Sequence, residues 1–230
     1  MLQTHKVRAI TLDLDDTLWP IWPTIAKAEK ALGAWFTDNA PATGQFWSDA
    51  ERRRLLREQV MQEHEHLVHD MAFLRRESIR RALAQAGDDE ALATTAFDVF
   101  IAVRHEVELY EDALEALEFL ASRFPLVAVS NGNADLGRIG LMPHFRAAFS
   151  AASFGVGKPD ARIFLAAAEA AGVPAEAVLH VGDDALLDVL GAHAVGMQTA
   201  WINRGEHPWT QTVQPHASLR DLRELCALFS

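Results

Sequence analysis

Apolar and polar positions along the chain change their spacing twice. Val7–Leu12 is a short β-rich apolar run that stops at the carboxylates of DLDDT, which predicts a buried strand followed by a polar loop. From about Trp19 to Glu108 the chain is rich in Ala, Leu, Glu and Arg and has almost no β-branched runs. The apolar residues there recur at helical spacing. This spacing predicts four helices, at Ile21–Thr37, Phe46–Gln62, Leu67–Ala86 and Asp89–Val107.

From Glu111 onward, strand-like and helix-like segments alternate. The pattern predicts strands at Leu126–Ser130, Ala147–Ala151, Val178–Val181 and Gln198–Ile202, and helices at Asp112–Ser122, Asp160–Ala171 and Ala185–Val195. Such alternation indicates βαβ units and a parallel sheet. The predicted fold class is therefore α/β, with a doubly wound parallel sheet core formed by residues 1–18 and 109–230. Residues 19–108 are predicted to be an inserted helical domain.

Composition narrows the possible functions. The 230 residues carry 21 Lys+Arg against 32 Asp+Glu, a net charge of −11, which argues against a nucleic-acid partner. A phosphorylated substrate would need a local cation, because the overall field repels anions. The single cysteine, Cys226, excludes an internal disulfide and a cysteine zinc site and favours a cytoplasmic location. We expect no signal peptide, because the N-terminal apolar run is short and ends in carboxylates, and no membrane partner, because no apolar run is long enough to span a bilayer.

Polar motifs follow three of the predicted strands. In open α/β sheets, ligands bind beyond the carboxyl ends of the strands. The motifs there are DLDDT at 13–17, SNGN at 130–133 and GDD at 182–184, and a fourth polar motif, GKPD, lies at 157–160. The candidate site residues are Asp13, Asp15, Asp16, Thr17, Ser130, Asn131, Lys158, Asp183, Asp184 and Asp188.

So many carboxylates cannot all ionise close together without opposing positive charge. Lys158 is the one basic residue in these motifs, and Mg²⁺ is the divalent cation that such oxygen ligands favour. Asp13 and Asp15 are two residues apart, so one can act as a nucleophile on phosphorus and the other as an acid and base. Ser130 and nearby backbone N–H groups would hold phosphoryl oxygens. Asp16 is better explained as a carboxylate that fixes the loop.

The motifs DLDDT, SNG, GKPD and GDDALLD resemble, in order and in placement, the four motifs of the haloacid dehalogenase-like hydrolases. The resemblance implies a Rossmann-like core and an α-helical cap over the site, formed by residues 19–108. It implies that Asp13 is the nucleophile, that Asp15 is the general acid and base, and that Asp13, the Asp15 main-chain carbonyl and Asp183 hold Mg²⁺. The resemblance further implies that Ser130 and Lys158 bind phosphate and that Asp188 orients Lys158 or a metal-bound water. We also assign phosphate binding to Thr17 and Asn131, and a supporting role to Asp184.

Within this family, the dehalogenase branch lacks the second aspartate, so Asp15 favours phosphoryl chemistry. The segments SNGNAD and HVGDDALLDVLGAHAVGMQTAWI resemble bacterial phosphatases that act on FMN and on 5-amino-6-(5-phospho-D-ribitylamino)uracil. The leading hypothesis is a Mg²⁺-dependent phosphomonoesterase of a small phosphorylated metabolite. The alternatives are a phosphoglucomutase-type transfer, a binding or regulatory module without turnover, and a 2-haloacid dehalogenase, which Asp15 disfavours.

Several residues of the predicted cap keep two interpretations. His64, His66 and His69 do not have the HExxH spacing of a zinc site, and a solvated or partly packed helix explains them better. Contact with substrate competes with ordinary packing or solvation for Trp19, Trp22, Arg75 and Arg76. The sequence leaves a monomer and a homodimer equally open.

Overall fold

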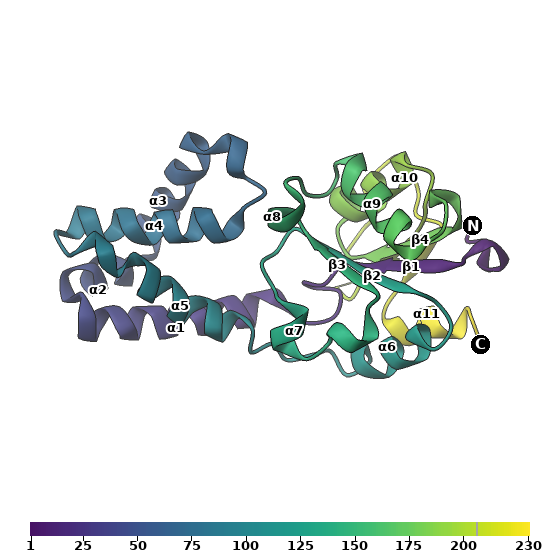
Figure 1. Cartoon of the computed structure of the whole chain (residues 1–230), viewed down its shortest axis with the longest axis horizontal. Helices are drawn as coiled ribbons and strands as arrows, with labels where there is room; N and C mark the ends of the chain where they lie inside the picture. Colours follow the sequence, from purple (N-terminus) through teal and green to yellow (C-terminus); the bar gives the residue numbers. More distant parts are fainter. Residues whose placement is uncertain (206) are drawn as a thin grey trace. The chain divides into compact units, whose positions relative to one another are not determined.

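The chain folds into two compact units. The computed structural model describes residues 1–205 and 207–230. Residues 1–20 and 108–230 form one unit, called here the α/β unit, and residues 21–107 form the helical unit (Figure 1). The helical unit thus interrupts the α/β unit after its first strand.

A six-stranded parallel sheet forms the centre of the α/β unit. Its order is β3-β2-β1-β4-β5-β6, so β1 lies between β2 and β4, and every neighbouring pair is parallel. Residues of four of the strands are buried throughout, as expected for a sheet covered on both faces. The fold class predicted from the sequence is confirmed. The strands are β1 (Ala9–Leu12), β2 (Leu126–Ser130), β3 (Ala147–Ser150), β4 (Val178–Gly182), β5 (Gln198–Ile202) and β6 (Ala217–Leu219).

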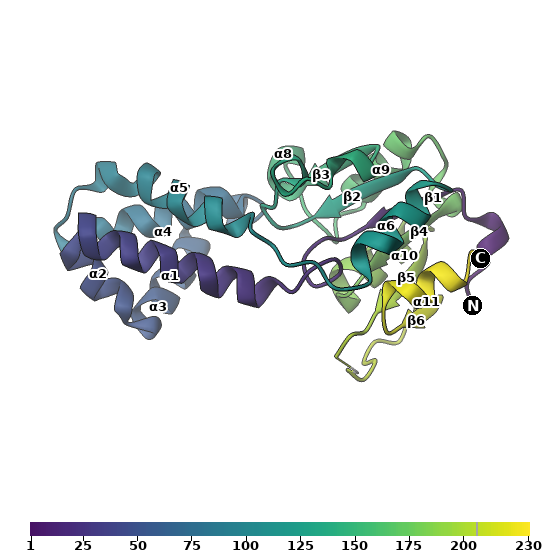
Figure 2. The same cartoon turned by 90° about the horizontal axis from the view of Figure 1, so that it is seen from below.

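Helices cover both faces of this sheet. On one face, α9 (Ala161–Ala171) packs on β1, β2 and β3, with Ile163 and Phe164 in the shared core. On the opposite face lie α6 (Ala113–Ala121) and α11 (Leu222–Ala227), which pack against each other (Figures 1 and 2). The shorter elements of the unit are η1 (Thr4–Lys6), α7 (Leu136–Ile139), η4 (Met142–His144), α8 (Ala151–Phe154), η5 (Ala175–Ala177), η6 (Ala185–Leu190) and α10 (Gly191–Ala194).

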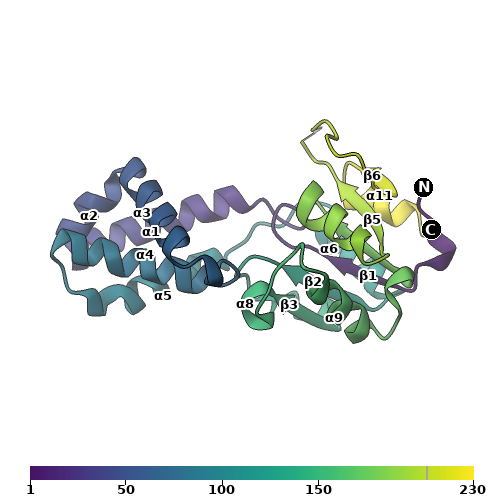
Figure 3. The ribbon, with the colours of Figure 1, turned by 90° about the horizontal axis from the view of Figure 1, so that it is seen from above.

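Figure 3 shows the helices of the helical unit, and they enclose an apolar core of their own. On its first helix, Ala28, Leu32 and Phe36 recur every four residues and are all fully buried, which is the stripe an amphipathic helix needs. The helices are α1 (Ile21–Asn39), α2 (Pro41–Ser48), α3 (Ala50–Glu63), η2 (Glu65–Leu67), α4 (Met71–Ala86), η3 (Glu90–Leu92) and α5 (Ala93–Arg104).

Aspartate caps explain where the predicted helices were wrong. The single helix predicted at Phe46–Gln62 is two, because the Asp49 carboxylate accepts the N–H groups of Glu51 and Arg52 and starts α3 anew. The helix predicted from Leu67 begins only at Met71, where Asp70 is the cap. The helix predicted at Asp89–Val107 begins with the short η3, and α5 ends at Arg104. The sequence interpretation missed α2, where Pro41 occupies the first helical position.

Three differences concern the α/β unit. The helix predicted at Ala185–Val195 is a π-helix over residues 185–190 followed by the α-helical turn α10. The strand at 198–202, taken as the last, is followed by β6 and α11. The first strand is shorter than predicted and begins at Ala9. Among the described residues, none of the helices combines the length and the apolar character that a bilayer crossing requires.

Candidate active site

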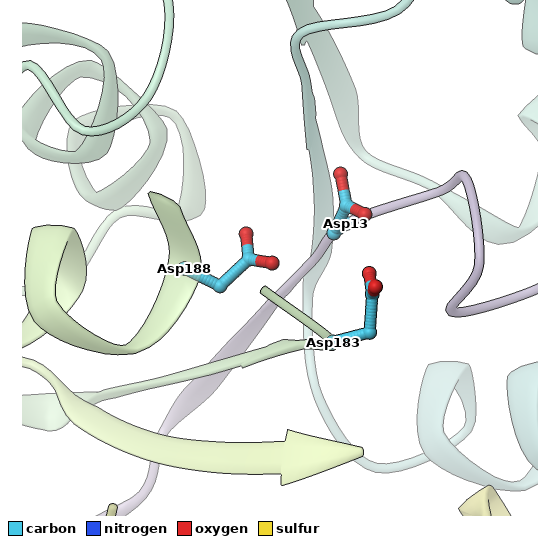
Figure 4. A group of neighbouring side chains, drawn as sticks. All are labelled: Asp13, Asp183 and Asp188. Atoms are coloured by element: carbon cyan, nitrogen blue, oxygen red, sulfur yellow. The ribbon is translucent and has the colours of Figure 1, made fainter. Parts of the chain in front are cut away.

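Three carboxylates converge at the carboxyl edge of the sheet. Because β1 lies beside β4, Asp13 follows one strand and Asp183 follows its neighbour at the same edge. The Asp13 N–H donates to the Val181 carbonyl at 2.9 Å, which keeps the two strand ends together. Asp188 comes from η6, and the three carboxylates point toward one another, with one oxygen of each within 4.8 Å of the others (Figure 4).

Lys158 supplies a positive charge inside this group. Its Nζ donates to Asp13 Oδ1 and to Asp188 Oδ1, each at 2.5 Å, and its side chain is almost completely buried. Asn131 fixes the lysine backbone, because it accepts the Lys158 N–H at 2.7 Å and donates to the Lys158 carbonyl at 2.8 Å. A Cβ at Gly157 would lie 2.5 Å from Asn131 Oδ1, so glycine permits this close approach. Both polar atoms of the Asn131 amide therefore bind the Lys158 backbone.

Asp188 uses both of its carboxylate oxygens within the protein. Oδ1 accepts from Lys158 and faces His180 Nε2 at 3.0 Å, while Oδ2 accepts the Asp184 N–H at 2.9 Å. A Cβ at Gly182 would lie 2.3 Å from Asp188 Cγ, so only glycine leaves room for the carboxylate there. Asp188 thus contacts Lys158 through Oδ1 and the backbone of Asp184 through Oδ2.

The charges in the cluster do not balance. Burial raises the pKa of Asp183 to about 7, and the neighbouring Asp188 and Asp16 carboxylates add to the rise. Burial also raises the pKa of Asp13, despite the opposing effect of Lys158. Although burial opposes it, Lys158 and the hydrogen bond from His180 hold the pKa of Asp188 below its usual value. Burial likewise opposes the charge on Lys158, yet the two carboxylates hold its pKa above the usual value. The buried Asp13 and Asp188 share one ammonium group, and the partly buried Asp183 lies beside them.

The donor set fits a hard divalent cation. One oxygen of Asp13 accepts a hydrogen bond from Lys158. Among the described side chains, the hydrogen-bond donor to the Asp183 carboxylate is Thr17 Oγ1, at a long 3.4 Å. Both can therefore offer an oxygen to Mg²⁺, whereas the Asp188 oxygens are already occupied by hydrogen bonds. Within the described part of the chain, one group of acidic, histidine or cysteine side chains is close enough together to hold a metal ion. It consists of Asp13, Asp183 and Asp188.

The loop after β1 turns back on itself. Asp16 has a positive φ of 59°, which aspartate tolerates, and its N–H donates to the Trp19 carbonyl at 2.7 Å. The Trp19 indole N–H donates to Asp15 Oδ1 at 2.8 Å, and Trp19 is completely buried. The structure thus places the Asp15 carboxylate against Trp19 and outside the group of three carboxylates.

Two more predicted residues have local partners. Ser130 closes β2, is buried, and its Oγ accepts the Gly132 N–H at 3.0 Å. Asp184, predicted to support the site, caps η6 by accepting the N–H groups of Leu186 and Leu187. A pocket of about 430 Å³ opens beside Ser130; its lining includes Leu14, Asn133, Phe149, Ser150 and Ser153.

Two polar contacts near the site were missed from the sequence. His180 lies in the apolar run VLHV of a buried strand. The signal in the sequence is that it is the one polar residue in this run. Arg204 donates to both Asp112 oxygens, at 3.0 and 2.9 Å, and to the Thr17 carbonyl at 3.0 Å. Arg204 also lies 3.8 Å above the Tyr110 ring. His180 opens the segment HVGDDALLD, but the segment does not show which side chains the imidazole contacts. Arg204 lies outside the motifs, and its partners are distant in sequence.

Three residues of the helical unit for which the sequence allowed two interpretations, Arg75, Arg76 and His64, take part in local packing. Arg75 pairs with Glu29 and lies 4.3 Å above the Phe100 ring, and Arg76 lies 5.6 Å from the Phe97 ring centre. The His64 ring packs edge-on against Phe73. Trp22 is 75% exposed, unlike the buried Trp19 of the α/β unit.

Comparisons with known proteins agree with this arrangement. Residues 7–196 match the family model of the haloacid dehalogenase-like hydrolases. The 5-amino-6-(5-phospho-D-ribitylamino)uracil phosphatase YigB of Escherichia coli is 33% identical, over 97% of this chain and 96% of its own. A phosphoserine phosphatase of Thermus thermophilus is 34% identical over 64% of this chain and 61% of its own. A crystal structure described as a 2-haloacid dehalogenase from Pseudomonas syringae has a TM-score of 0.89 and 36% identity, covering 97% of this chain and 100% of that chain.

Two of these relatives cover 97% of the chain, and the family model spans all four polar motifs. The names of the relatives include two phosphatases and a dehalogenase. The relatives therefore share a family but act on different substrates. The chain is an enzyme that belongs to the haloacid dehalogenase-like hydrolases and is similar over nearly its whole length to a phosphatase of that family.

Proposed function

We propose that this hydrolase, a phosphatase of its family, is a Mg²⁺-dependent phosphomonoesterase that works through a phospho-aspartate on Asp13. The observation that carries the proposal is the contact of buried Lys158 with both Asp13 and Asp188, beside Asp183. A buried ammonium group at a carboxylate nucleophile lets a phosphoryl group approach an otherwise anionic centre.

In the first step, a carboxylate oxygen of Asp13 attacks phosphorus while the bond from phosphorus to the substrate oxygen breaks. The acid form of Asp15 donates its proton to that leaving oxygen. The hydrogen bond from Trp19 to Asp15 supports this role, because it fixes the orientation of the carboxyl group in the loop. Lys158, Ser130 and the loop at Thr17 stabilise the charge on the phosphoryl oxygens.

In the second step, the Asp15 carboxylate takes a proton from water, and the water oxygen attacks phosphorus. The bond from phosphorus to Asp13 breaks, so phosphate leaves and both carboxyl groups return to their starting forms. We propose that Asp13, the Asp15 main-chain carbonyl and Asp183 would hold Mg²⁺. When bound there, the ion offsets the negative charge that the carboxylates and the phosphoryl group bring together.

We propose that the helical unit acts as a cap that selects the substrate and excludes water. The Tyr110 N–H donates to the Leu18 carbonyl at 2.9 Å, so the two linkers to the helical unit are joined where they leave the α/β unit. Small-angle scattering of the protein with Mg²⁺ and a phosphate analogue should detect compaction. An unchanged scattering profile would contradict the role of a cap.

For the substrate, we propose a ribitylaminouracil phosphate or FMN. The support is the similarity to the Escherichia coli phosphatase across 97% of the chain. The hydroxyl and amide groups lining the pocket beside Ser130 suit a polyhydroxyl chain. A cytoplasmic location and action on a small metabolite, as a monomer or homodimer, stay predictions from composition and resemblance.

Phosphate release from a panel of phosphorylated metabolites, with Mg²⁺ and with a chelator, tests the reaction class. The panel should include FMN, the ribitylaminouracil phosphate, phosphoserine, sugar phosphates and nucleotides. Asp15→Asn should abolish almost all turnover and keep substrate binding, since it removes only the proton donor. Phosphate release without Mg²⁺, or by Asp15→Asn at the rate of the wild type, would contradict the mechanism.

A 2-haloacid dehalogenase is the second candidate, because the structural neighbour with a TM-score of 0.89 carries that description. Asp15 argues against it, since the dehalogenases that the motifs resemble lack this aspartate. Halide release from 2-chloropropionate, measured on the same preparation, separates the two reactions. Halide release without phosphate release would overturn the proposed phosphatase.

A further inference from the structure

His180 is a buried polar residue at the centre of an apolar sheet. It lies in β4, is 1% exposed, and its ring packs edge-on against Phe164 of α9 at 5.0 Å. The residues around it on this face of the sheet are apolar, including Val178 and Ile163. A buried imidazole needs partners for both ring nitrogens, because an unsatisfied buried polar group is destabilising.

Both ring nitrogens have partners. Nδ1 lies 2.7 Å from Thr11 Oγ1 on the neighbouring strand β1, and Nε2 lies 3.0 Å from Asp188 Oδ1. Thr11 and His180 are paired in the register of the two strands, so the sheet itself sets the first contact. A continuous buried path of hydrogen bonds therefore runs from Thr11 through His180 and Asp188 to Lys158.

The polarity of this path follows from its acidic end. Asp188 accepts from Lys158 and from the Asp184 N–H, so it is an ionised acceptor. Nε2 of His180 must then carry a hydrogen and donate to Asp188. In the neutral ring Nδ1 is an acceptor, and the Thr11 hydroxyl donates to it. Thr11 thus satisfies the bare Nδ1 of the tautomer that holds Asp188.

The other end of the path is the catalytic lysine. An ammonium group has three hydrogens, and Asp13 and Asp188 accept two of them. The direction of the third is fixed only while both carboxylates keep their orientation. His180 and Lys158 hold Oδ1 of Asp188, and the Asp184 N–H holds Oδ2, so loss of His180 would remove one of the three hydrogen bonds that orient the carboxylate.

We propose that His180 is a positioning residue for phosphoryl transfer. In this proposal Thr11 supports the tautomer in which His180 holds Asp188, so that Asp188 directs Lys158 toward the phosphoryl group. This inference rests on the proposed function and extends it by two residues that touch no substrate. It predicts that the buried polar pair in the sheet contributes to turnover and not only to the core.

Four variants test the inference. His180→Phe removes the donor but keeps a ring against Phe164, and His180→Gln keeps an amide N–H that can reach Asp188. Thr11→Val removes the hydroxyl and keeps the shape. Thr199→Val is the matched control, because Thr199 is also fully buried, is paired with His180 in the sheet register on β5, and contacts His216.

We expect His180→Phe to lower kcat about 10- to 100-fold, the range typical of outer partners that orient site residues. KM should change less, because several groups bind the substrate phosphate. His180→Gln should recover part of the loss, Thr11→Val should show a smaller loss, and Thr199→Val should keep the kcat of the wild type. All rates refer to folded protein, measured by near-UV circular dichroism and thermal unfolding.

Nitrogen NMR of the His180 ring gives a readout that needs no turnover. The resonance, assigned by its absence in His180→Phe, should show a protonated Nε2 and an unprotonated Nδ1, and Thr11→Val should weaken this preference. A wild-type kcat in both His180→Phe and Thr11→Val, or a protonated Nδ1 with a bare Nε2, would overturn the inference. A wild-type enzyme that releases no phosphate from any substrate would contradict the proposed function instead, and the NMR result would still decide the tautomer.

Discussion

Replacing Lys158 by methionine would leave two buried carboxylates, Asp13 and Asp188, without their ammonium partner. Lys158→Met keeps the length of the side chain and removes its charge, so packing changes little. Removal of one partner from a buried ion pair typically destabilises a protein by about 3–5 kcal/mol, and here two carboxylates lose the same partner. For a chain of this size, that loss corresponds to a fall in Tm of about 6–20 °C.

The loss should depend on pH, because the carboxylates can bind protons when the lysine is gone. Near pH 5 the variant can keep its buried acids neutral, whereas near pH 8 it must ionise them or unfold. The difference in Tm between wild type and variant should therefore be larger at pH 8 than at pH 5. Scanning calorimetry at both pH values in the presence of a chelator measures it directly.

Lys27→Met is the matched control for this experiment. Lys27 also forms a short ion pair, at 2.6 Å with Glu106, but both side chains are more than half exposed. An exposed pair contributes about 0–1 kcal/mol, so the control should unfold close to the wild-type temperature. Equal Tm values for Lys158→Met and wild type at pH 8 would refute the claim that Lys158 balances the buried charge.

Four further predictions concern the motif at residues 182–188. Asp184→Ala should destabilise the fold by about 1 kcal/mol through the lost cap of η6, while Mg²⁺ binding measured by calorimetry stays near wild type. Asp183→Asn should weaken Mg²⁺ binding strongly in the same titration; retained affinity would exclude Asp183 as a ligand. Gly182→Ala should lower kcat at least tenfold, since the added Cβ would lie 2.3 Å from Asp188 Cγ; an unchanged rate would show that Asp188 can move without effect. The pKa of Asp183 is about 7 in the folded protein, above that of an unfolded aspartate. This carboxyl group therefore stabilises the metal-free fold below pH 4, and the stabilisation is lost as the pH rises toward 7. Mg²⁺ should raise Tm more at pH 8 than at pH 5.5, which calorimetry can check.

The elements predicted best from the sequence are those whose local pattern and tertiary environment agree. β2 was predicted at its observed bounds, because a run of five buried residues between polar loops has one interpretation in an α/β chain. The breaks at Asp49 and Asp70 were missed because an aspartate inside a polar helical run can equally be a solvated side chain. Only the backbone shows that its carboxylate accepts the N–H groups of the next turn.

The candidate site shows a similar division. Asp13, Lys158, Asp183 and Asp188 were chosen from the sequence because strand-end motifs in a parallel sheet meet at one edge, and the structure brings these four together. The contact of Asn131 with the Lys158 backbone was not predictable, since a side-chain amide suits a phosphate and a main chain equally well.

His180 was missed for a different reason. Its role depends on the strand register, which places Thr11 beside it, and on the turn into η6, which brings Asp188 back over the strand. Neither is encoded in the spacing of residues along one segment.

The distribution of charge explains how a chain with a net charge of −11 can attract an anionic substrate. The long-range field of the protein is unfavourable, but interactions within a few ångströms in a buried site are screened far less than those across solvent. Lys158 lies at that range from Asp13, and a cation held by Asp13 and Asp183 would lie there as well. Raising the salt concentration should therefore increase the rate of substrate encounter, by screening the repulsive field, and leave kcat nearly unchanged. A fall in kcat/KM with added salt would mean instead that surface cations attract the substrate, and that the buried cluster is not the main source of its recognition.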